Sequence, residues 1–357
     1  MKIFEKYRFP FCALFVFPLM ASPSISSATE PSKAVPLSVH SSLSYTDFLE
    51  QIREEALRKH LAPKLVIKKA LSFAEKQPYP NKAILKKDRN QPEFHWSWKV
   101  YKDNVISPDR LEQGKKEYRK EQKIFNKVSS SYHVNPHVIL GIWGIETHFG
   151  SVEGKNNVFA ALSTLAFDGR RSQYFKKELL TAIEIAGKTG MNPAKMTSSY
   201  AGAMGQPQFM PTAYINFATT GSDKVFFKHR YPDIWNNKKD ALTSIANYLQ
   251  KSGWDRETPW GEMVRVMPAS GKENIFSGTK NYSTAPQHTL SEWETLGVYP
   301  ITGEHFVHPE LKGILFQPEG QAGESFMLYP NFKVIMRYNP SEFYALAAAL
   351  LGDLSCQ

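Results

Sequence analysis

The chain has 357 residues, of which 42% are hydrophobic and 22% are charged. This composition excludes a disordered chain and a bundle of membrane helices, and the length suffices for one compact multi-lobed unit or two to three domains. An excess of 44 lysines and arginines over 34 aspartates and glutamates gives a formal net charge of +10, which favours an anionic polymer as a partner.

Residues 1–28 have the pattern of a secretory signal peptide. Basic residues precede the apolar run Phe9–Ala21, and a stretch of small residues ends at Ala28. Such a short apolar run is typical of a signal peptide and not of a helix that spans a bilayer. We therefore expect export, with cleavage after Ala21 or Ala28; an uncleaved amino-terminal anchor is the alternative.

The two cysteines fit an exported protein without internal disulfides. Cys12 lies inside the signal and follows Phe9-Pro10-Phe11, which is not the lead-in that a lipid-attachment cysteine needs, so we expect no lipoprotein. Cleavage leaves Cys356 as the single cysteine, either as a free thiol or as half of an intermolecular disulfide. These features predict a periplasmic location.

The positive charge of the mature chain has two interpretations. Its basic residues are scattered, and no recognition helix or base-stacking motif accompanies them, so we predict no nucleic-acid partner. The charge then forms a solvated basic face or attracts a carboxylate-rich polymer of the cell wall. Export favours the polymer.

The amino-terminal part reads as a flexible leader followed by a helical domain. Residues 29–44 are rich in serine and proline, as flexible leaders are. Apolar spacing predicts two helices within residues 45–75, separated at Pro63, in a domain that extends to residue 110. We interpret the aromatic stretch Phe94–Tyr101 as an extended segment that lines a groove, and Ser107-Pro108-Asp109 as the start of a helix that runs to about Tyr132.

Residues 111–258 are predicted to form a helical core and residues 259–330 an inserted, mostly β domain. The core helices are expected from Asn135, at 172–187, at 212–219 and at 238–250, whereas glycine and proline break residues 259–330 into short β-prone runs. Residues 331–357 are expected to form a strand and the helix Ser341–Leu351, packed on the core. The fold class is therefore mainly α, with a small β part.

Glu146 is the single carboxylate within the apolar, aromatic and glycine-marked stretch Gly141–Gly150. Asn135 caps this helix, Pro136 opens it, and apolar residues surround it, so we expect the helix to be buried. Burial raises the pKa of a glutamic acid and suits it to donate a proton near neutral pH. Glu146 is therefore a candidate general acid, and an exposed or paired structural glutamate is the alternative.

The stretch Ser198–Pro211 is a candidate sugar-binding loop. Its small residues let a ligand approach the backbone, while Gln208 and Phe209 offer an amide and a stacking face. A plain turn between helices is the other interpretation.

Several motifs resemble, in the same order, those of the lytic murein transglycosylase B family. They are Gly144-Ile145-Glu146-Thr147 with Phe149-Gly150, Gly169–Phe175, Ala201–Gly205, Gln208–Pro211, Asp233-Ile234-Trp235, Ala246–Leu249 and Pro330–Asn339. The resemblance extends from about Tyr45 to Leu354 and implies a lysozyme-like helical core. It also implies non-hydrolytic cleavage of peptidoglycan between N-acetylmuramic acid and N-acetylglucosamine, which leaves a 1,6-anhydro end.

The resemblance implies a set of site residues and partners. Glu146 matches the sole acid/base of the family, and Arg170, Arg171 and Tyr174 match a motif that lines the glycan and peptide groove. Saccharide contacts are implied at Ser199, Gln208, Phe209, Tyr248, Tyr338 and Asn339, and Tyr101 occupies the place of a groove-lining tyrosine. Peptidoglycan glycan strands are the implied substrate and the cell-wall synthesis machinery a further partner; we expect a monomer.

A single carboxylate is consistent with this chemistry. A hydrolytic glycosidase needs two carboxylates, but no second one lies in a comparable apolar stretch, and Asp168 precedes a turn that it could cap. One suffices if Glu146 protonates the leaving oxygen and then accepts the proton of the substrate's own C6 hydroxyl, with the acetamido group stabilising the cationic carbon. A catalytically silent wall-binding protein and a lysozyme-type hydrolase are the alternatives.

Three positions depart from the family pattern. Many relatives carry an EF-hand-like calcium loop before the Asp-aliphatic-Trp motif, but residues 219–233 lack alternating Asp or Asn ligands and contain several cations, so we expect no metal and no other cofactor. Pro207 removes a backbone donor where some relatives have glycine. His148 replaces a residue that is often basic, and either tunes Glu146 or is simply exposed.

Overall fold

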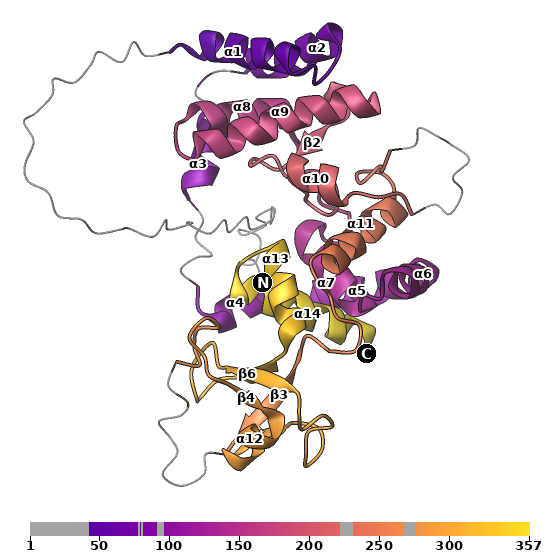
Figure 1. Cartoon of the computed structure of the whole chain (residues 1–357), viewed down its shortest axis with the longest axis vertical. Coiled ribbons are helices and arrows are strands. Elements are labelled where there is room, and N and C mark those ends of the chain that lie inside the picture. The colour runs from indigo at the N-terminus through magenta and orange to yellow at the C-terminus, as the bar shows by residue number, and fades with distance from the viewer. Residues whose placement is uncertain are drawn as a thin grey trace, which may run out of the picture.

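A computed structural model describes residues 43–77, 79, 81–90, 96–221, 231–267, 276 and 278–357. Several predictions fall outside the described residues. They concern the signal peptide with Cys12, the leader up to residue 42, and residues 222–230, where many relatives have a calcium loop. The described chain forms a stack of helices with a small sheet at one end (Figure 1). The mainly α fold class with a small β part is confirmed.

The amino-terminal helices are α1 (Tyr45–Arg58), α2 (Lys64–Glu75) and α3 (Lys82–Arg89). Ser44 and Asp47 form a capping box that starts α1, and Pro63 separates α1 from α2, as the sequence predicted. Their apolar faces share a core with α8 (Val158–Phe167) and α9 (Ser172–Thr189). Figure 1 shows α1 and α2 lying across α8 and α9.

Two predictions are wrong within residues 96–132, whereas Phe94 and His95 of the predicted extended segment lie outside the described residues. Residues 98–101 are not extended, because Ser97 caps a helix, α4 (Trp98–Val105), by accepting a hydrogen bond from the amide of Val100. The expected single helix is divided into α5 (Pro108–Lys120) and α6 (Gln122–Tyr132). Glu121 lies between them with φ −100° and ψ 15°, outside the helical range.

The middle of the chain contains α7 (Pro136–Thr147), α10 (Pro211–Phe217) and α11 (Lys238–Lys251), together with the short 3-10 helix η2 (Pro193–Lys195). Strands β1 (Asn156–Asn157) and β2 (Thr197–Ser198) form a two-stranded antiparallel pair. The predicted helices of this region are confirmed to within a few residues, and α8 is a helix that the apolar pattern had not revealed.

The inserted β part is a five-stranded antiparallel sheet in the order β4-β6-β7-β3-β5. Its strands are β3 (Gly261–Val266), β4 (Gln287–Thr289), β5 (Val298–Pro300), β6 (Lys312–Phe316) and β7 (Ser325–Leu328), and α12 (Leu290–Thr295) covers it. Val264 pairs with both Ser325 and Pro300, and Trp293 of α12 is fully buried in this sheet's own core. The expected mostly β insertion is confirmed.

The carboxyl-terminal residues form two helices, α13 (Pro330–Tyr338) and α14 (Glu342–Cys356). The predicted strand is therefore wrong, because Pro330 opens a helix. Helix α14 packs very closely on α7: a Cβ at Gly141 would lie 1.8 Å from the carbonyl oxygen of Ala348, and one at Gly352 would lie 2.0 Å from that of His137. Glycine at both positions allows this approach.

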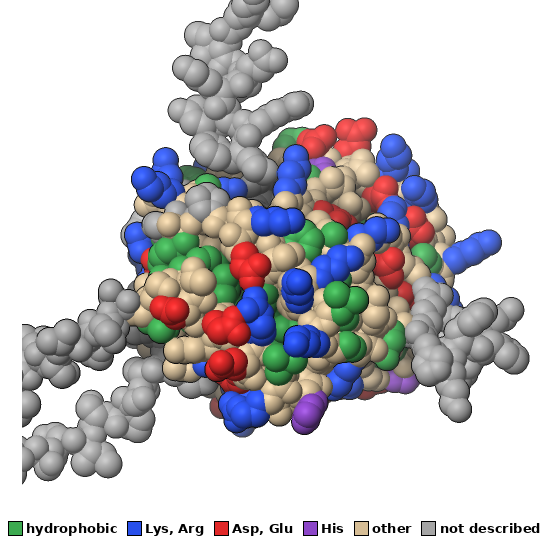
Figure 2. Space-filling model, turned by 90° about the horizontal axis from the view of Figure 1, so that it is seen from above, with side chains coloured by type: hydrophobic (Ala, Val, Ile, Leu, Met, Phe, Trp, Pro, Cys, Tyr) green, Lys and Arg blue, Asp and Glu red, His purple; other side chains and the backbone are tan. Residues whose placement is uncertain are grey.

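No helix among the described residues is long and apolar enough to cross a bilayer. The face seen from above in Figure 2, over α1 and α2, carries many lysine and arginine side chains with acidic and apolar ones between them. This distribution agrees with the scattered positive charge of the sequence.

Candidate active site

Glu146 lies in the last turn of α7, the most deeply buried helix around the site. Every residue from Val138 to Thr147 is buried, and Glu146 itself is 4% exposed. Asn135 caps the start by accepting from the amide of His137, and His148 ends the helix in the left-handed conformation, with φ 48°. The buried helix that the sequence predicted is confirmed.

The two oxygens of the Glu146 carboxyl have different environments. The Tyr344 hydroxyl donates to Oε1 at 2.6 Å, whereas Oε2 is buried and has no hydrogen-bond partner among the described residues. Burial raises the pKa of Glu146 to about 8, and the Tyr344 hydrogen bond opposes this rise. A carboxyl with this pKa is mostly protonated at neutral pH, and no described residue occupies its second oxygen.

Tyr338, Tyr248 and Phe209 form an aromatic cluster beside this carboxyl. The Tyr338 ring centroid lies 4.7 Å from that of Tyr248 and 5.9 Å from that of Phe209. The Glu146 carboxylate contributes to raising the pKa of Tyr338 well above its ordinary value, after burial. The Tyr338 hydroxyl donates to the carbonyl oxygen of Pro207 at 2.6 Å, and Tyr248 donates to that of Arg337.

The candidate sugar-binding loop is folded by its own polar side chains. The Ser199 hydroxyl is fully buried and accepts from the amides of Ala201 and Ala203, at 3.2 and 3.1 Å, so it holds the loop in shape. Gln208 has a positive φ of 50°. Its amide nitrogen donates to the carbonyl oxygen of Gly205 at 2.8 Å, and its Oε1 is buried without a partner among the described residues.

Tyr101 and Asn339 are largely buried. Tyr101, on α4, is 2% exposed and its ring lies 5.8 Å from that of Phe343; it contributes to raising the pKa of Tyr344. Asn339, at the end of α13, accepts from the amide of Ser341 at 3.1 Å. Both therefore lie close to the elements that hold Glu146, and their predicted contact with saccharide stays a prediction.

Arg170, Arg171 and Tyr174 lie around the start of α9. Arg170 donates to the side chain of Asp88 at 2.7 Å and to its backbone carbonyl at 2.9 Å, which ties this turn to α3. The Arg171 guanidinium lies 4.9 Å from the ring centroid of Tyr174. Asp168, which could have been a second catalytic carboxylate, forms an ion pair with Arg89 at 2.6 Å.

His148 is not simply exposed. Its Nδ1 accepts from Arg110 Nε at 3.4 Å, and its Nε2 lies 3.6 Å from a carboxylate oxygen of Asp109. Burial and the adjacent Arg110 lower its pKa. His148 is therefore held against α5 at the end of α7.

The sequence reasoning missed Tyr344, Glu153 and Gln206. Tyr344 lies in an alanine-rich helix, and the one sequence signal for a site residue there is that its side chain is both polar and aromatic. Glu153 is a half-buried loop carboxyl whose pKa burial and Asp233 raise to about 7. The pKa of Glu146 is instead raised by burial and lowered by the Tyr344 hydrogen bond. The two carboxyls therefore have separate environments.

Comparison with known proteins places the chain among the lytic transglycosylases. Residues 44–353 match the family described as "Transglycosylase SLT domain". The membrane-bound lytic murein transglycosylase B of Escherichia coli K12 is 32% identical over 260 residues, which are 72% of this chain and 67% of the relative.

Solved structures of relatives have the same fold. SltB3 from Pseudomonas aeruginosa, in complex with NAG-NAM-pentapeptide, has a TM-score of 0.77 and 33% identity over 87% of this chain and 79% of its own. Escherichia coli Slt35, in complex with calcium, has a TM-score of 0.68 and 29% identity over 86% and 92%. The chain therefore belongs to the transglycosylase SLT domain family, as a lytic murein transglycosylase of the B type.

Proposed function

We propose that this lytic transglycosylase cleaves the β-1,4 bond between N-acetylmuramic acid and N-acetylglucosamine without water, with Glu146 performing both proton transfers. The observation that carries the proposal is the Glu146 carboxyl, which is buried, has a pKa raised to about 8, and has one oxygen without a hydrogen-bond partner among the described residues. Such a group is protonated at neutral pH and is suited to act first as an acid.

The reaction balances with this one carboxyl. Glu146 donates its proton to the glycosidic oxygen while the bond from that oxygen to C1 of the muramoyl residue breaks. The carboxylate then accepts the proton of the C6 hydroxyl as O6 bonds to C1, which forms the 1,6-anhydro ring and restores the acid. The substrate's acetamido group assists by stabilising C1, and the Tyr344 hydroxyl stabilises the carboxylate between the two steps.

The aromatic cluster and Gln208 are proposed to hold the sugar. Tyr248, Tyr338 and Phe209 are mutually in contact beside Glu146, and the unpartnered Oε1 of Gln208 can accept from a sugar hydroxyl or amide. The relative SltB3 binds NAG-NAM-pentapeptide, which supports the same class of ligand here.

We propose that the enzyme needs no calcium. Residues 219–233 correspond to the calcium loop of many relatives. The backbone amide of Gly221 donates to one side-chain oxygen of Asp240 at 3.0 Å, and the backbone amide of Asp233 donates to the other at 3.0 Å. Asp233 in turn accepts from the amides of Trp235 and Asn236. Backbone donors therefore occupy the carboxylates of Asp233 and Asp240. The sequence from 222 to 232 contains one acidic residue, Asp223. This set of donors does not fit calcium.

We also propose that the enzyme acts as a monomer in the periplasm, alongside the cell-wall synthesis machinery. The signal-peptide pattern and the positive net charge support the location and the anionic polymer. Size-exclusion chromatography of the mature chain at several concentrations tests the monomer, and fractionation of cells tests the location.

Digestion of purified sacculi followed by mass spectrometry tests the reaction. Wild-type enzyme should release anhydro-muropeptides, and Glu146→Gln should bind sacculi but release none. Products heavier by one water would identify a lysozyme-type hydrolase. Binding without products from the wild type would identify a silent wall-binding protein.

A further inference from the structure

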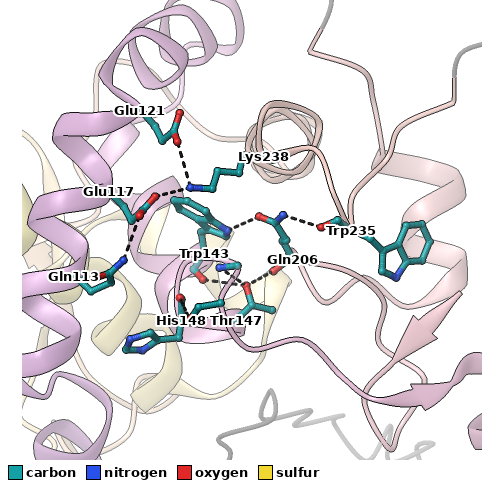
Figure 3. Close-up of polar contacts among 11 residues, drawn as sticks. Gln113, Glu117, Glu121, Trp143, Thr147, His148, Gln206, Trp235 and Lys238 are labelled. Carbon is teal, nitrogen blue, oxygen red and sulfur yellow. Dashed lines mark hydrogen bonds and ion pairs between the residues drawn. The ribbon is translucent and has the colours of Figure 1, made fainter. Parts of the chain in front are cut away.

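Gln206 joins the catalytic helix to the candidate sugar-binding loop through all of its polar groups. Its side-chain Oε1 accepts from the indole nitrogen of Trp143 at 3.0 Å, and its backbone carbonyl accepts from the hydroxyl of Thr147 at 2.9 Å. Its side-chain nitrogen donates to the carbonyl oxygen of Trp235 at 2.8 Å, and its backbone amide donates to that of Ile234 at 2.8 Å. Figure 3 shows Gln206 between Trp143 and Trp235.

The two helix residues that Gln206 holds flank the catalytic carboxyl. Trp143 and Thr147 are four residues apart and therefore share one face of α7. Glu146 lies between them in sequence, in the last turn before the helix ends at His148. The last turn of a helix frays unless other groups hold it. Gln206 holds one side of this turn, and Tyr344 of α14 holds the carboxyl itself.

The same residue sets the position of the loop. Pro207, the next residue, accepts from Tyr338, and Gln208 and Phe209 follow directly. Gly205 and Gly150 allow close packing here, since a Cβ at Gly205 would lie 2.7 Å from Ile234 and one at Gly150 would lie 2.6 Å from the Gln206 side chain. A displacement of Gln206 would therefore move the sugar contacts relative to the acid.

The Trp143 ring is also in contact with a cation. The Lys238 ammonium lies 5.4 Å from the ring centroid and pairs with Glu117 at 2.7 Å and Glu121 at 3.2 Å. Figure 3 shows this chain of contacts from Glu117 of α5 and the adjacent Glu121 through Lys238 and Trp143 to Gln206. Trp143 therefore has little freedom to compensate for a lost Gln206 contact.

We propose that Gln206 is a positioning residue of the transglycosylase reaction, which sets the Glu146 carboxyl at the distance from the sugar-binding loop that proton transfer requires. The inference rests on the proposed role of Glu146. A misplacement of about 1 Å can cost on the order of 100-fold in rate. Gln206 therefore acts on kcat more than on KM.

Gln206→Ala tests the proposal, with Gln317→Ala as its matched control. Gln317 is also fully buried and bonded through both side-chain amide atoms, to Thr279 and Ser325, but it lies in the β part. Gln206→Ala should lower kcat by about 10- to 100-fold with KM changed less than about threefold. Gln317→Ala should lower the melting temperature and leave kcat within about threefold.

Gln206→Glu provides a rescue that a purely structural role would not show. When protonated, the new carboxyl can accept from Trp143 and donate to Trp235; when ionised, it loses the second bond. The charged or titratable groups around Trp143 and Thr147 are Glu146, Lys238, Glu117, Glu121 and His148, and all are unchanged in this variant. Its kcat relative to wild type should be near one at pH 5 and fall at least tenfold by pH 8.

The outcomes separate this inference from the proposed function. If the wild type releases no anhydro products, the proposed function fails. If the wild type releases anhydro products, two results would show that the positioning role is wrong. One is a Gln206→Ala variant with wild-type kcat, and the other is a Gln317→Ala variant whose kcat falls as much as that of Gln206→Ala. If Gln206→Ala does not fold, Trp143→Phe, which removes the indole donor, should still lower kcat at least fivefold, and an unchanged kcat would overturn the proposal.

Discussion

The hydroxyl of Tyr344 donates a 2.6 Å hydrogen bond to Oε1 of Glu146, across 198 positions of sequence. The bond exists because α14 lies directly against α7, at the glycine positions Gly141 and Gly352. This hydrogen bond opposes the burial-driven rise in the pKa of Glu146. The acidity of Glu146 therefore depends on how closely two helices from different parts of the chain pack.

Removal of this hydrogen bond should shift the pH dependence of catalysis upward. Tyr344→Phe keeps the ring and loses the donor to the carboxylate, and a hydrogen bond to a charged group contributes about 1.5–3 kcal/mol. The pKa of Glu146 should therefore rise by about one to two units, since one unit corresponds to about 1.36 kcal/mol. The alkaline limb of the kcat profile should move to higher pH, and the maximal kcat should fall because the carboxylate is less stabilised. An unchanged alkaline limb would contradict this role.

Glu146 should reduce the stability of the folded enzyme as pH rises. Its pKa is raised from 4.5 to about 8 in the folded state, so the folded state binds a proton that the unfolded state has released. The stabilising contribution of the protonated group is fully present below pH 4.5 and is lost as pH rises toward 8, with a slope of at most about 1.4 kcal/mol per pH unit.

Glu146→Gln should remove that loss, because the amide does not titrate. The variant should match wild type near pH 4.5 and become more stable by several kcal/mol near pH 8, an upper bound from the same slope. Urea unfolding at pH 5, 6.5 and 8 measures the difference. A stability gap that does not widen with pH would show that the carboxyl is not buried as a neutral acid.

Glu153 should not be a catalytic partner. Its pKa is raised to about 7 by burial and Asp233, and a second carboxylate is the requirement of a hydrolase. Glu153→Gln should keep anhydro products and at least about a third of wild-type kcat, whereas Glu146→Gln keeps none. A loss of two orders of magnitude, or products that contain added water in the wild type, would favour hydrolysis.

Close packing of α7 and α14 should be essential for stability. In Gly141→Ala the new methyl group would lie 1.8 Å from the backbone carbonyl of Ala348, so the helices must separate. Overpacking of this kind typically costs about 1–3 kcal/mol, and backbone clashes cost more. The melting temperature should fall by several degrees. A melting temperature equal to that of the wild type would show that the contact is looser than described.

Calcium should not change the stability of the enzyme. A bound ion stabilises only the state that binds it, and Asp233 and Asp240 are already occupied by backbone donors. Melting curves recorded with about 5 mM calcium and with a chelator should coincide. This calcium concentration is high enough to fill even weak sites. A calcium-dependent rise would show that residues 219–233 hold the ion.

Local patterns predicted the parts of the structure that depend on neighbouring residues. Asn135 and Pro136 marked the start of α7, its apolar surface marked it as buried, and its lone carboxyl marked the candidate acid. Glycine and proline breaks similarly marked the β part. These features are readable because caps, turns and burial patterns are encoded within a few residues.

Sequence-based predictions were wrong where the secondary-structure propensity of the residues competed with tertiary packing. The aromatic residues of α4 have β propensity, but burial of Trp98 and Tyr101 against α14 favours a helix. The β-prone run after Pro330 predicts a strand, whereas Phe332 and Ile335 are three residues apart and bury one face of α13. In both segments tertiary contacts outweighed the propensity of the residues.

The sequence by itself singled out Glu146 as the candidate acid, showed which loop carries small and amide groups, and showed which family the motifs resemble. The tertiary structure decided what surrounds them. Tyr344, Gln206 and Lys238 reach the Glu146 helix from distant segments, and the pKa of Glu146 arises from burial that the whole fold creates. Hydrogen bonds and desolvation depend on distances in space, and sequence spacing does not specify those distances beyond a single helix or turn.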